Sequence, residues 1–339
     1  MKKKQIIGIL ITGAVIIAVG FMGMLSNVVK DKLTQQTADT ADVMSSLVSD
    51  NSVNLPSEDF VGVIDIVGEI GPSSSSNSSI LSSSQSEYNH DLYMNYIDQM
   101  EESKNNKGIL LNVNTPGGTV YESDELYLKL MEYKKNTGRP VWAYFGQEAC
   151  SGGYYISMAS DKIYANRNCW TGSIGVIVSL TNYKELYDKL GIKEIDITSG
   201  ANKAMGSGGL DLTEEQRNIL QGLVDEAYDQ FVSVVSEGRG MDEASVKTLA
   251  DGRIYTAKQA KENGLVDEVA SYEEEKNAMI KQFDLDEDIL FFTPDSSSVS
   301  SFFRSLMGAV KDATPKSEAE IAKEIVDSKG KGVLKYYAE

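Results

Sequence analysis

The first block of the hydrophobic pattern is an uncharged run of 20 residues, 6–25, behind a basic flank at 1–5. A helix of that length spans roughly 30 Å of hydrocarbon, and the flanking lysines favour a cytoplasmic N-terminus. A cleaved signal peptide is the alternative, but no A-x-A-like cleavage site follows the run. The pattern therefore predicts an uncleaved transmembrane signal anchor at 6–25, with the rest of the chain outside the cytoplasm.

The next blocks are polar, apart from one strand-like segment. Residues 26–56 have short apolar islands without a strong period and are interpreted as a stalk. Residues 60–70 are rich in β-branched residues and are predicted to form a strand. Residues 73–87 are dominated by serine and are expected to form a flexible loop.

From about residue 90 onward, helical and strand-like patterns alternate. Such alternation is typical of an α/β domain with a largely parallel sheet, here placed at 57–285 and followed by a C-terminal tail at 286–339. Thr213 and Gln216 have the spacing of a capping box at the start of the longest helix. The predicted helices are 92–103, about 120–136, a short one after residue 151, 182–191 and 212–240, and the predicted strands are 108–113, 140–145, 162–165, 172–180 and 192–198.

Composition excludes several classes of function. The formal net charge of −18 disfavours binding to nucleic acid or to an anionic membrane surface. Two cysteines and one histidine are too few for a Cys-rich or His-based metal site, so no metal or cofactor is expected.

The segment 147–165, which begins QEACSGGYY, places Ser151 in a small-residue turn before a predicted helix. A serine needs a base to become a nucleophile, and the usual base is histidine. His90 lies beside the serine-rich segment and is expected to be a solvated loop residue or to lie near a helix cap. A Ser-His-Asp triad is therefore disfavoured.

Lysine is the remaining candidate base, and it must be desolvated to accept a proton near neutral pH. Lys203 lies in TSGANKAMGSGG, where no other charged residue is close in sequence and a predicted strand leads into the stretch. An exposed lysine in a flexible surface loop remains the alternative from composition alone.

A serine hydrolase also needs backbone N–H groups directed at the developing oxyanion. The turn at 114–118, NTPGG, ends a predicted strand and opens a helix, so the N–H groups of Gly118 and Gly152 are a natural pair of donors. An ordinary tight turn between strand and helix is the alternative for this motif.

Five motifs together resemble the signal peptide peptidase A family of membrane-anchored serine peptidases, in its short form from Gram-positive bacteria. The resemblance covers about residues 58–280 and implies a ClpP/crotonase-like fold of repeated β-β-α units. It also implies a ring-shaped homo-oligomer whose active sites are built partly from neighbouring subunits. The motifs are NTPGGTVYESDEL, ACSGGYYISMASDKIYAN, TGSIGV, SGANKAMG and GRIYTAKQAKENGLVDEV.

The resemblance implies a role for each matching residue. Ser151 corresponds to the nucleophile, Lys203 to the general base, and Gly118 and Gly152 to the oxyanion hole. Ser173, in TGSIGV, corresponds to a serine that orients the lysine. Cys150 stands where alanine is common, which raises the alternative that the thiol is the nucleophile, but no histidine is present to form a thiolate pair.

The expected function is that of a single-pass cell-membrane serine endopeptidase with a Ser-Lys dyad and an extracytoplasmic catalytic domain. It would cleave remnant signal peptides and other short hydrophobic or unfolded peptides. The alternatives are a crotonase-like acyl-CoA enzyme, which the membrane anchor disfavours, and a catalytically silent peptide-binding scaffold. The apolar end of the tail, VLKYYAE, is a candidate to enter the protein's own peptide groove.

Overall fold

A computed structural model describes residues 53–73, 88–294 and 335–337, which all belong to one compact unit, Asn51–Glu339. The predicted anchor at 6–25 lies outside these residues, as do most of the stalk, the serine-rich loop and the tail. No helix in the described ranges is long and apolar enough to cross a membrane.

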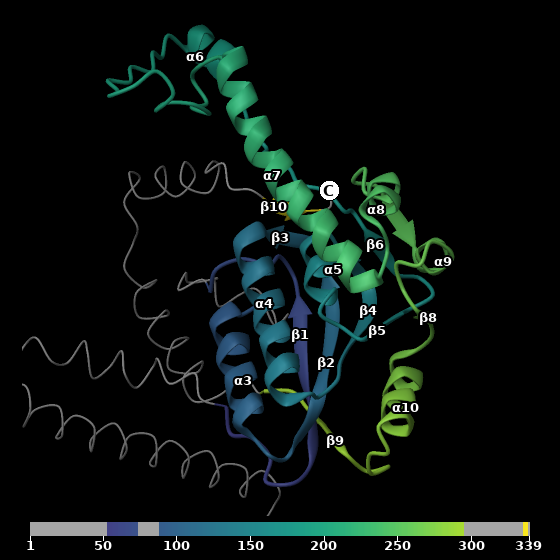
Figure 1. Cartoon of the computed structure of the whole chain (residues 1–339). Coiled ribbons are helices and arrows are strands. Elements are labelled where there is room, and N and C mark those ends of the chain that lie inside the picture. Colours follow the sequence, from purple (N-terminus) through teal and green to yellow (C-terminus); the bar gives the residue numbers. More distant parts are fainter. Residues whose placement is uncertain (1–52, 74–87, 295–334, 338–339) are drawn as a thin grey trace, which may run out of the picture. The chain divides into compact units, whose positions relative to one another are not determined.

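One eight-stranded sheet runs through the described part of the chain (Figure 1). Its strands are β1 (Phe60–Val67), β2 (Asn106–Thr115), β4 (Val141–Cys150), β5 (Lys162–Ala165), β6 (Trp170–Gly172), β7 (Ile254–Thr256), β8 (Glu268–Val269) and β9 (Leu290–Phe292). They pair in the order β7-β6-β4-β2-β1-β9, and β5 joins β4 to β8. Every pairing is parallel except that of β6 with β7. The prediction of an α/β domain with a largely parallel sheet is confirmed.

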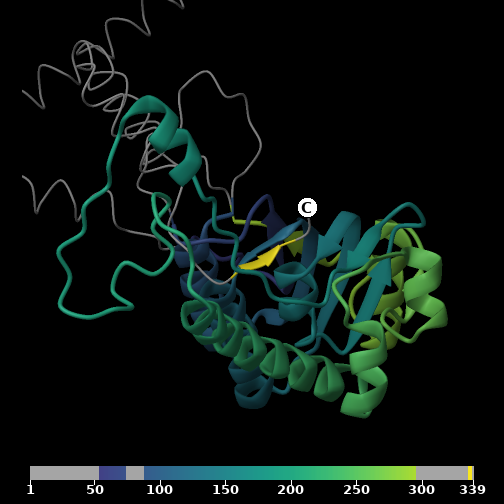
Figure 2. The ribbon, with the colours of Figure 1, turned by 90° about the horizontal axis from the view of Figure 1, so that it is seen from above.

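Helices cover both faces of this sheet, and two short strands pair beside it (Figure 2). The helices are α3 (His90–Glu102), α4 (Val120–Thr137), α5 (Gly152–Ser157), α6 (Lys184–Leu190), α7 (Glu214–Arg239), α8 (Glu243–Leu249), α9 (Ala257–Glu262) and α10 (Tyr272–Gln282). The two short strands are β3 (Gly117–Thr119) and β10 (Lys335–Tyr337), which pair antiparallel.

Side chains along the central strands alternate strictly between the two faces of the sheet. In β4, Val141, Ala143 and Phe145 enter the core that contains buried residues of α3, α4, α5 and α7. Trp142 and Tyr144 point to the opposite face, where they join the smaller core beneath α10. Side chains of successive strand residues point to opposite faces, so a strand that is covered on both sides is apolar at every position.

The long helix α7 begins and ends as the sequence predicts. Thr213 and Gln216 form a capping box, and Gly240 ends the helix in the left-handed conformation. Its buried residues all lie from Ala227 onward, and the N-terminal half extends away from the sheet toward α6 in Figure 1. Only the C-terminal half of α7 therefore contributes to the core.

Two predicted strands are wrong. In the segment 172–180 only the residue at 172 belongs to β6, and residues 192–198 form no strand. Ile195 and Ile197 are 80% and 99% exposed. A strand needs a neighbouring strand to satisfy its backbone groups, and the described residues provide none for this segment.

The sheet also extends past residue 285, where the tail was predicted to begin. Residues 290–292 form β9, which pairs parallel with β1 at the edge of the sheet.

Candidate active site

Ser151 occupies the sharp turn between β4 and α5. Its φ of 51° and ψ of −114° are unusual for a residue other than glycine, and such strained positions cluster at functional sites. Its N–H donates to the carbonyl of Gly172 at 2.8 Å, and its carbonyl accepts from the N–H of Tyr155 at 2.9 Å. The backbone is therefore fixed on both sides of the side chain. The Oγ is buried and has no hydrogen-bond partner among the described residues.

The strand β3 presents the backbone of Gly118 beside this turn. The carbonyl of Gly117 accepts from the N–H of Ile70 at 2.8 Å, and the N–H of Thr119 donates to the carbonyl of Ile70 at 2.9 Å. Backbone groups of successive strand residues point to opposite sides, so the N–H of Gly118 is directed away from Ile70. A Cβ at position 118 would lie 1.8 Å from the Ile70 oxygen, so only glycine fits there.

Gly152 brings the second candidate donor close to Gly118. A Cβ placed on Gly152 would lie 3.3 Å from the Gly118 nitrogen and 2.5 Å from the Ser123 Oγ. The missing side chain of Gly152 thus lets the start of α5 approach both β3 and α4. The structure brings Ser151, Gly118 and Gly152 together, as the sequence predicts.

Ser173 directly follows the neighbouring strand β6, as Ser151 follows β4. The register pairs Cys150 with Gly172, so the two serines follow paired residues of parallel strands. Ser173 is also buried, has a φ of 48°, and donates its N–H to the carbonyl of Arg253 at 2.8 Å. Its place beside the nucleophile turn fits the orienting role that the resemblance implies.

Lys203 is not brought to Ser151 in the single chain. It is exposed, in a turn-rich stretch between α6 and α7, and no strand leads into that stretch. It lines a pocket of about 570 Å³ that also includes Leu180, Met205 and Leu223. In the described chain, the Ser151 hydroxyl therefore has no base within hydrogen-bond distance.

The two cysteines are buried free thiols. Burial, with a smaller contribution from Glu148, raises the pKa of the Cys150 thiol to about 12. A thiol with that pKa is almost entirely protonated at neutral pH, which disfavours Cys150 as the nucleophile.

The surroundings of His90 correct one expectation. It lies next to the N-cap Asn89, so the interpretation that placed it near a helix cap agrees with the structure. The other interpretation, a solvated loop residue, is wrong, because His90 is only 5% exposed. Its ring nitrogens contact Tyr88 and Glu125, so the structure provides no contact between His90 and Ser151.

The backbone of residues 335–337 pairs with the edge of β3 that faces away from Ile70. Tyr336 is opposite Gly118 and Lys335 is opposite Thr119 in an antiparallel register. An extended segment thus runs along the strand that carries the candidate oxyanion donor (Figure 2).

Two contributors to the site were not predicted from the sequence. Ile70 holds β3 through its backbone, and Ser123, whose Oγ donates to the Thr119 carbonyl at 2.7 Å, lies against Gly152. In the sequence, the only indication that Ile70 contributes to the site is its position at the end of the apolar run 60–70. Nothing in the sequence indicates a contribution from Ser123. No cluster of three or more potential metal ligands occurs among the described residues.

A strained serine beside two glycine N–H groups, at the carboxyl ends of parallel strands, defines the kind of site that serine hydrolases use. Comparison with known proteins points to the same class. Residues 133–286 match the model of peptidase family S49. The resemblance to signal peptide peptidase A is confirmed.

Several known proteins are similar to this chain. An Enterococcus faecium protein named "Putative signal peptide peptidase SppA" is 43% identical over 64% of this chain and 63% of its own length. "Protease 4" of Haemophilus influenzae is 35% identical over 50% of this chain and 28% of its own length. "Serine protease SPPA, chloroplastic" of Arabidopsis thaliana is 32% identical over 51% of this chain and 25% of its own length. The chain spans less than two thirds of each of these relatives, and their names support a serine peptidase.

Proposed function

We propose that this protein is a serine endopeptidase in which Ser151 is the nucleophile and Lys203 the general base. The observation that carries the proposal is the buried, unpartnered Ser151 Oγ beside the backbone of Gly118 and Gly152. The family match and the relatives' names support the same class of reaction.

The chemistry follows from these groups. Neutral Lys203 takes the Ser151 proton as the Oγ attacks the scissile carbonyl carbon. The N–H groups of Gly118 and Gly152 stabilise the oxyanion, and the lysine passes its proton to the leaving amine. Lys203 then takes a proton from water, and the resulting attack on the acyl-enzyme releases the second product and restores the serine.

The lysine would come from a neighbouring copy of the chain. A lysine acts as a base only when it is desolvated, whereas Lys203 is exposed in the single chain. Large apolar side chains of the same segment are also exposed, and exposed apolar patches mark association surfaces. They include Ile177, Leu180, Leu186, Leu190, Ile192, Ile195 and Ile197. A ring-shaped homo-oligomer would cover this surface and bring Lys203 of one copy to Ser151 of the next.

The substrate would bind as an added strand. The antiparallel pairing of residues 335–337 with β3 supports this mode, because any extended peptide can form the same backbone hydrogen bonds. Remnant signal peptides and other short hydrophobic or unfolded peptides are the proposed substrates. The ClpP/crotonase-like arrangement of the fold, the membrane anchor at 6–25 and the extracytoplasmic location belong to the same proposal.

The first test uses the detergent-solubilised full chain and an internally quenched signal peptide. Ser151→Ala and Lys203→Ala should each lower kcat/KM by roughly 10³-fold or more, because each removes an essential partner of the dyad. Lys193→Ala, in the same exposed segment, is the matched control and should stay near wild type. A fluorophosphonate probe should label wild type at Ser151. Near-wild-type hydrolysis by either dyad variant would overturn the assignment.

The second test asks from which copy the lysine comes. Ser151→Ala and Lys203→Ala chains are unfolded together, refolded as mixed oligomers and assayed. If the dyad forms between copies, junctions with an intact serine and an intact lysine arise and hydrolysis returns in part. If the dyad forms within one chain, the mixture stays inactive.

A further inference from the structure

Thr115, the last residue of β2, is fully buried among the segments that form the candidate active site. Its Oγ1 accepts from the N–H of Gly117 at 3.0 Å and donates to the carbonyl of Gly68 at 2.5 Å. Gly68 follows β1, and Gly117 is the first residue of β3. One hydroxyl therefore joins the end of β1 to the start of the strand that carries Gly118.

The methyl group of Thr115 lies against the helix that follows the candidate nucleophile. A Cβ placed on Gly153, the second residue of α5, would lie 2.4 Å from the Thr115 Cγ2. The missing side chain of Gly153 thus leaves room for this methyl group two residues after Ser151. The side chain of Thr115 contacts β3 through its oxygen and α5 through its carbon, so it spaces the two segments that carry Gly118 and Gly152.

The local sequence favours the hydrogen bond between Thr115 and Gly117. Threonine hydroxyls commonly accept from the N–H two residues further along the chain, and the intervening Pro116 has no N–H of its own. The φ of Gly117 is 108°, a conformation that favours glycine. The carbonyl of Gly117 accepts from the N–H of Ile70 at 2.8 Å. Both backbone groups of Gly117 are therefore held, and the N–H of Gly118 is on the next residue.

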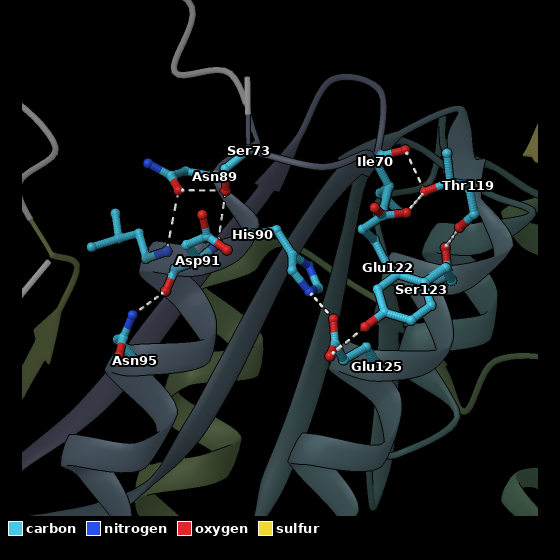
Figure 3. A network of polar contacts seen from close by, with 12 residues as sticks. Ile70, Ser73, Asn89, His90, Asp91, Asn95, Thr119, Glu122, Ser123 and Glu125 are labelled. Carbon is cyan, nitrogen blue, oxygen red and sulfur yellow. Dashed lines mark hydrogen bonds and ion pairs between the residues drawn. The ribbon is translucent and has the colours of Figure 1, made fainter. Parts of the chain in front are cut away.

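Different groups hold the other end of β3. The carbonyl of Thr119 accepts from the Ser123 Oγ at 2.7 Å (Figure 3). The N–H of Thr119 donates to the carbonyl of Ile70 at 2.9 Å. The hydroxyl of Thr115 thus holds the start of β3 and the hydroxyl of Ser123 holds its end, with Gly118 between them.

We propose that Thr115 is a positioning residue whose hydroxyl sets the place of the Gly118 N–H in the oxyanion hole, a role that rests on the proposed peptidase function. Oxyanion donors stabilise the transition state more than the bound substrate, so their displacement lowers kcat. A misplacement of about 1 Å in a catalytic site costs on the order of 10²-fold in rate. The position of β3 therefore matters to the reaction even though Thr115 does not touch the substrate.

Thr115→Val tests the hydroxyl, because it replaces the oxygen with a methyl group of similar size. Its carbon cannot lie 2.5 Å from the Gly68 oxygen and 3.0 Å from the Gly117 nitrogen, since non-bonded carbon contacts prefer about 3.5–4.0 Å. The start of β3 must therefore move, and kcat of the full chain for a quenched signal peptide should fall roughly 10²-fold. Thr115→Ser keeps both hydrogen bonds and should keep most of the wild-type kcat.

Thr137 offers a matched control, because its hydroxyl makes the same pair of hydrogen bonds at the far end of α4 from β3. It accepts from the N–H of Arg139 at 3.1 Å and donates to the carbonyl of Tyr133 at 2.7 Å. Thr137→Val should keep the wild-type kcat, although it loses two hydrogen bonds of the same kind. Urea unfolding of both valine variants shows that each is folded under the conditions of the assay.

Inhibition by a peptide aldehyde separates a positioning role from a loss of folded protein. The Ser151 Oγ adds to the aldehyde carbon, and the aldehyde oxygen of the tetrahedral adduct takes the place of the oxyanion. In Thr115→Val the Ki of this inhibitor should rise together with the fall in kcat. A fraction of inactive protein would instead lower the apparent kcat and leave Ki unchanged.

The proposal is overturned if Thr115→Val keeps the wild-type kcat and Ki, or if Thr137→Val loses as much activity. If Thr115→Val does not fold, Gly153→Ala takes its place, because its Cβ would press on the Thr115 Cγ2. Thr115→Ser removes that methyl group and should restore kcat in the double variant, and a failure to restore it also overturns the proposal. If Ser151→Ala hydrolyses peptide as fast as wild type, the proposed function fails instead.

Discussion

At the scale of single residues, the buried carboxyl of Glu275 stands out from the other acidic side chains. It lies on α10 with both oxygens buried and no hydrogen-bond partner among the described residues. Burial raises its pKa well above the usual range, so the folded protein holds this proton to a higher pH than the unfolded chain does. The unfolded chain releases that proton near pH 4.5, the ordinary value for a glutamate.

This difference predicts a stability that falls as the pH rises. Above the unfolded pKa the unfolded state binds fewer protons than the folded state, so the free energy of unfolding decreases toward the folded pKa. Glu275→Gln should flatten the profile, and Glu275→Met should add roughly 1–3 kcal/mol at pH 8 by removing the buried polar group. Urea unfolding at pH 5.5 and 8.5 measures both effects. Glu273→Gln, exposed on the same helix, should keep the wild-type slope, and an unchanged slope in Glu275→Gln would contradict the prediction.

The second prediction at this scale concerns Gly118. An alanine Cβ would lie 1.8 Å from the Ile70 oxygen, so Gly118→Ala must displace β3. Loss of one oxyanion donor lowers kcat by about 10²–10³-fold, and we expect at least that loss of peptide hydrolysis. Gly71→Ala is the control, because its Cβ would meet no atom within 4 Å. Active Gly118→Ala would show that this backbone position does not contact the reacting carbonyl.

At the scale of elements, β3 and β10 form a two-stranded sheet that leaves no free edge for a substrate strand. Residues 335–337 pair with the same backbone that the proposed substrate would use. A tethered segment competes at an effective concentration in the millimolar range, so the protein would compete with its own substrate.

Removing residues 333–339 should therefore lower KM for a short peptide, by roughly two- to tenfold, with little change in kcat. Replacing 335–337 with Pro-Gly-Pro keeps the length of the chain but disrupts strand pairing, and should act in the same way. Steady-state kinetics of the three proteins measures the effect. Equal KM values would show that the pairing does not restrict access to the site.

At the scale of the whole molecule, the residues of the proposed site fall into two groups, one at the end of the sheet and one away from it. Ser151, Ser173 and Gly152 follow the carboxyl ends of β4 and β6, and Gly118 lies in β3 beside them. Lys203 lies in an exposed segment whose apolar side chains lack cover within the described chain. In the proposed function, assembly of several copies would cover this surface and complete the proposed Ser-Lys dyad.

The sequence by itself determined the helices and strands with strong periodicity and the candidate nucleophile turn. Alternation in β4 and the capping box of α7 are local patterns, and local patterns survive in any fold that buries one face. Ser151 and Gly152 could be predicted because a small-residue turn before a helix is also local. Lys203 was singled out by its uncharged neighbours, which is a property of the sequence alone.

Only the tertiary structure decided which segments pair and which residues are buried. The apolar pattern at 192–198 predicts a strand, but no strand among the described residues lies beside it, because pairing depends on distant parts of the chain. His90 has polar neighbours in sequence and becomes buried because α4 packs over it. The roles of Ile70 and β10 are backbone contacts between segments far apart in the chain, and no side-chain pattern encodes them.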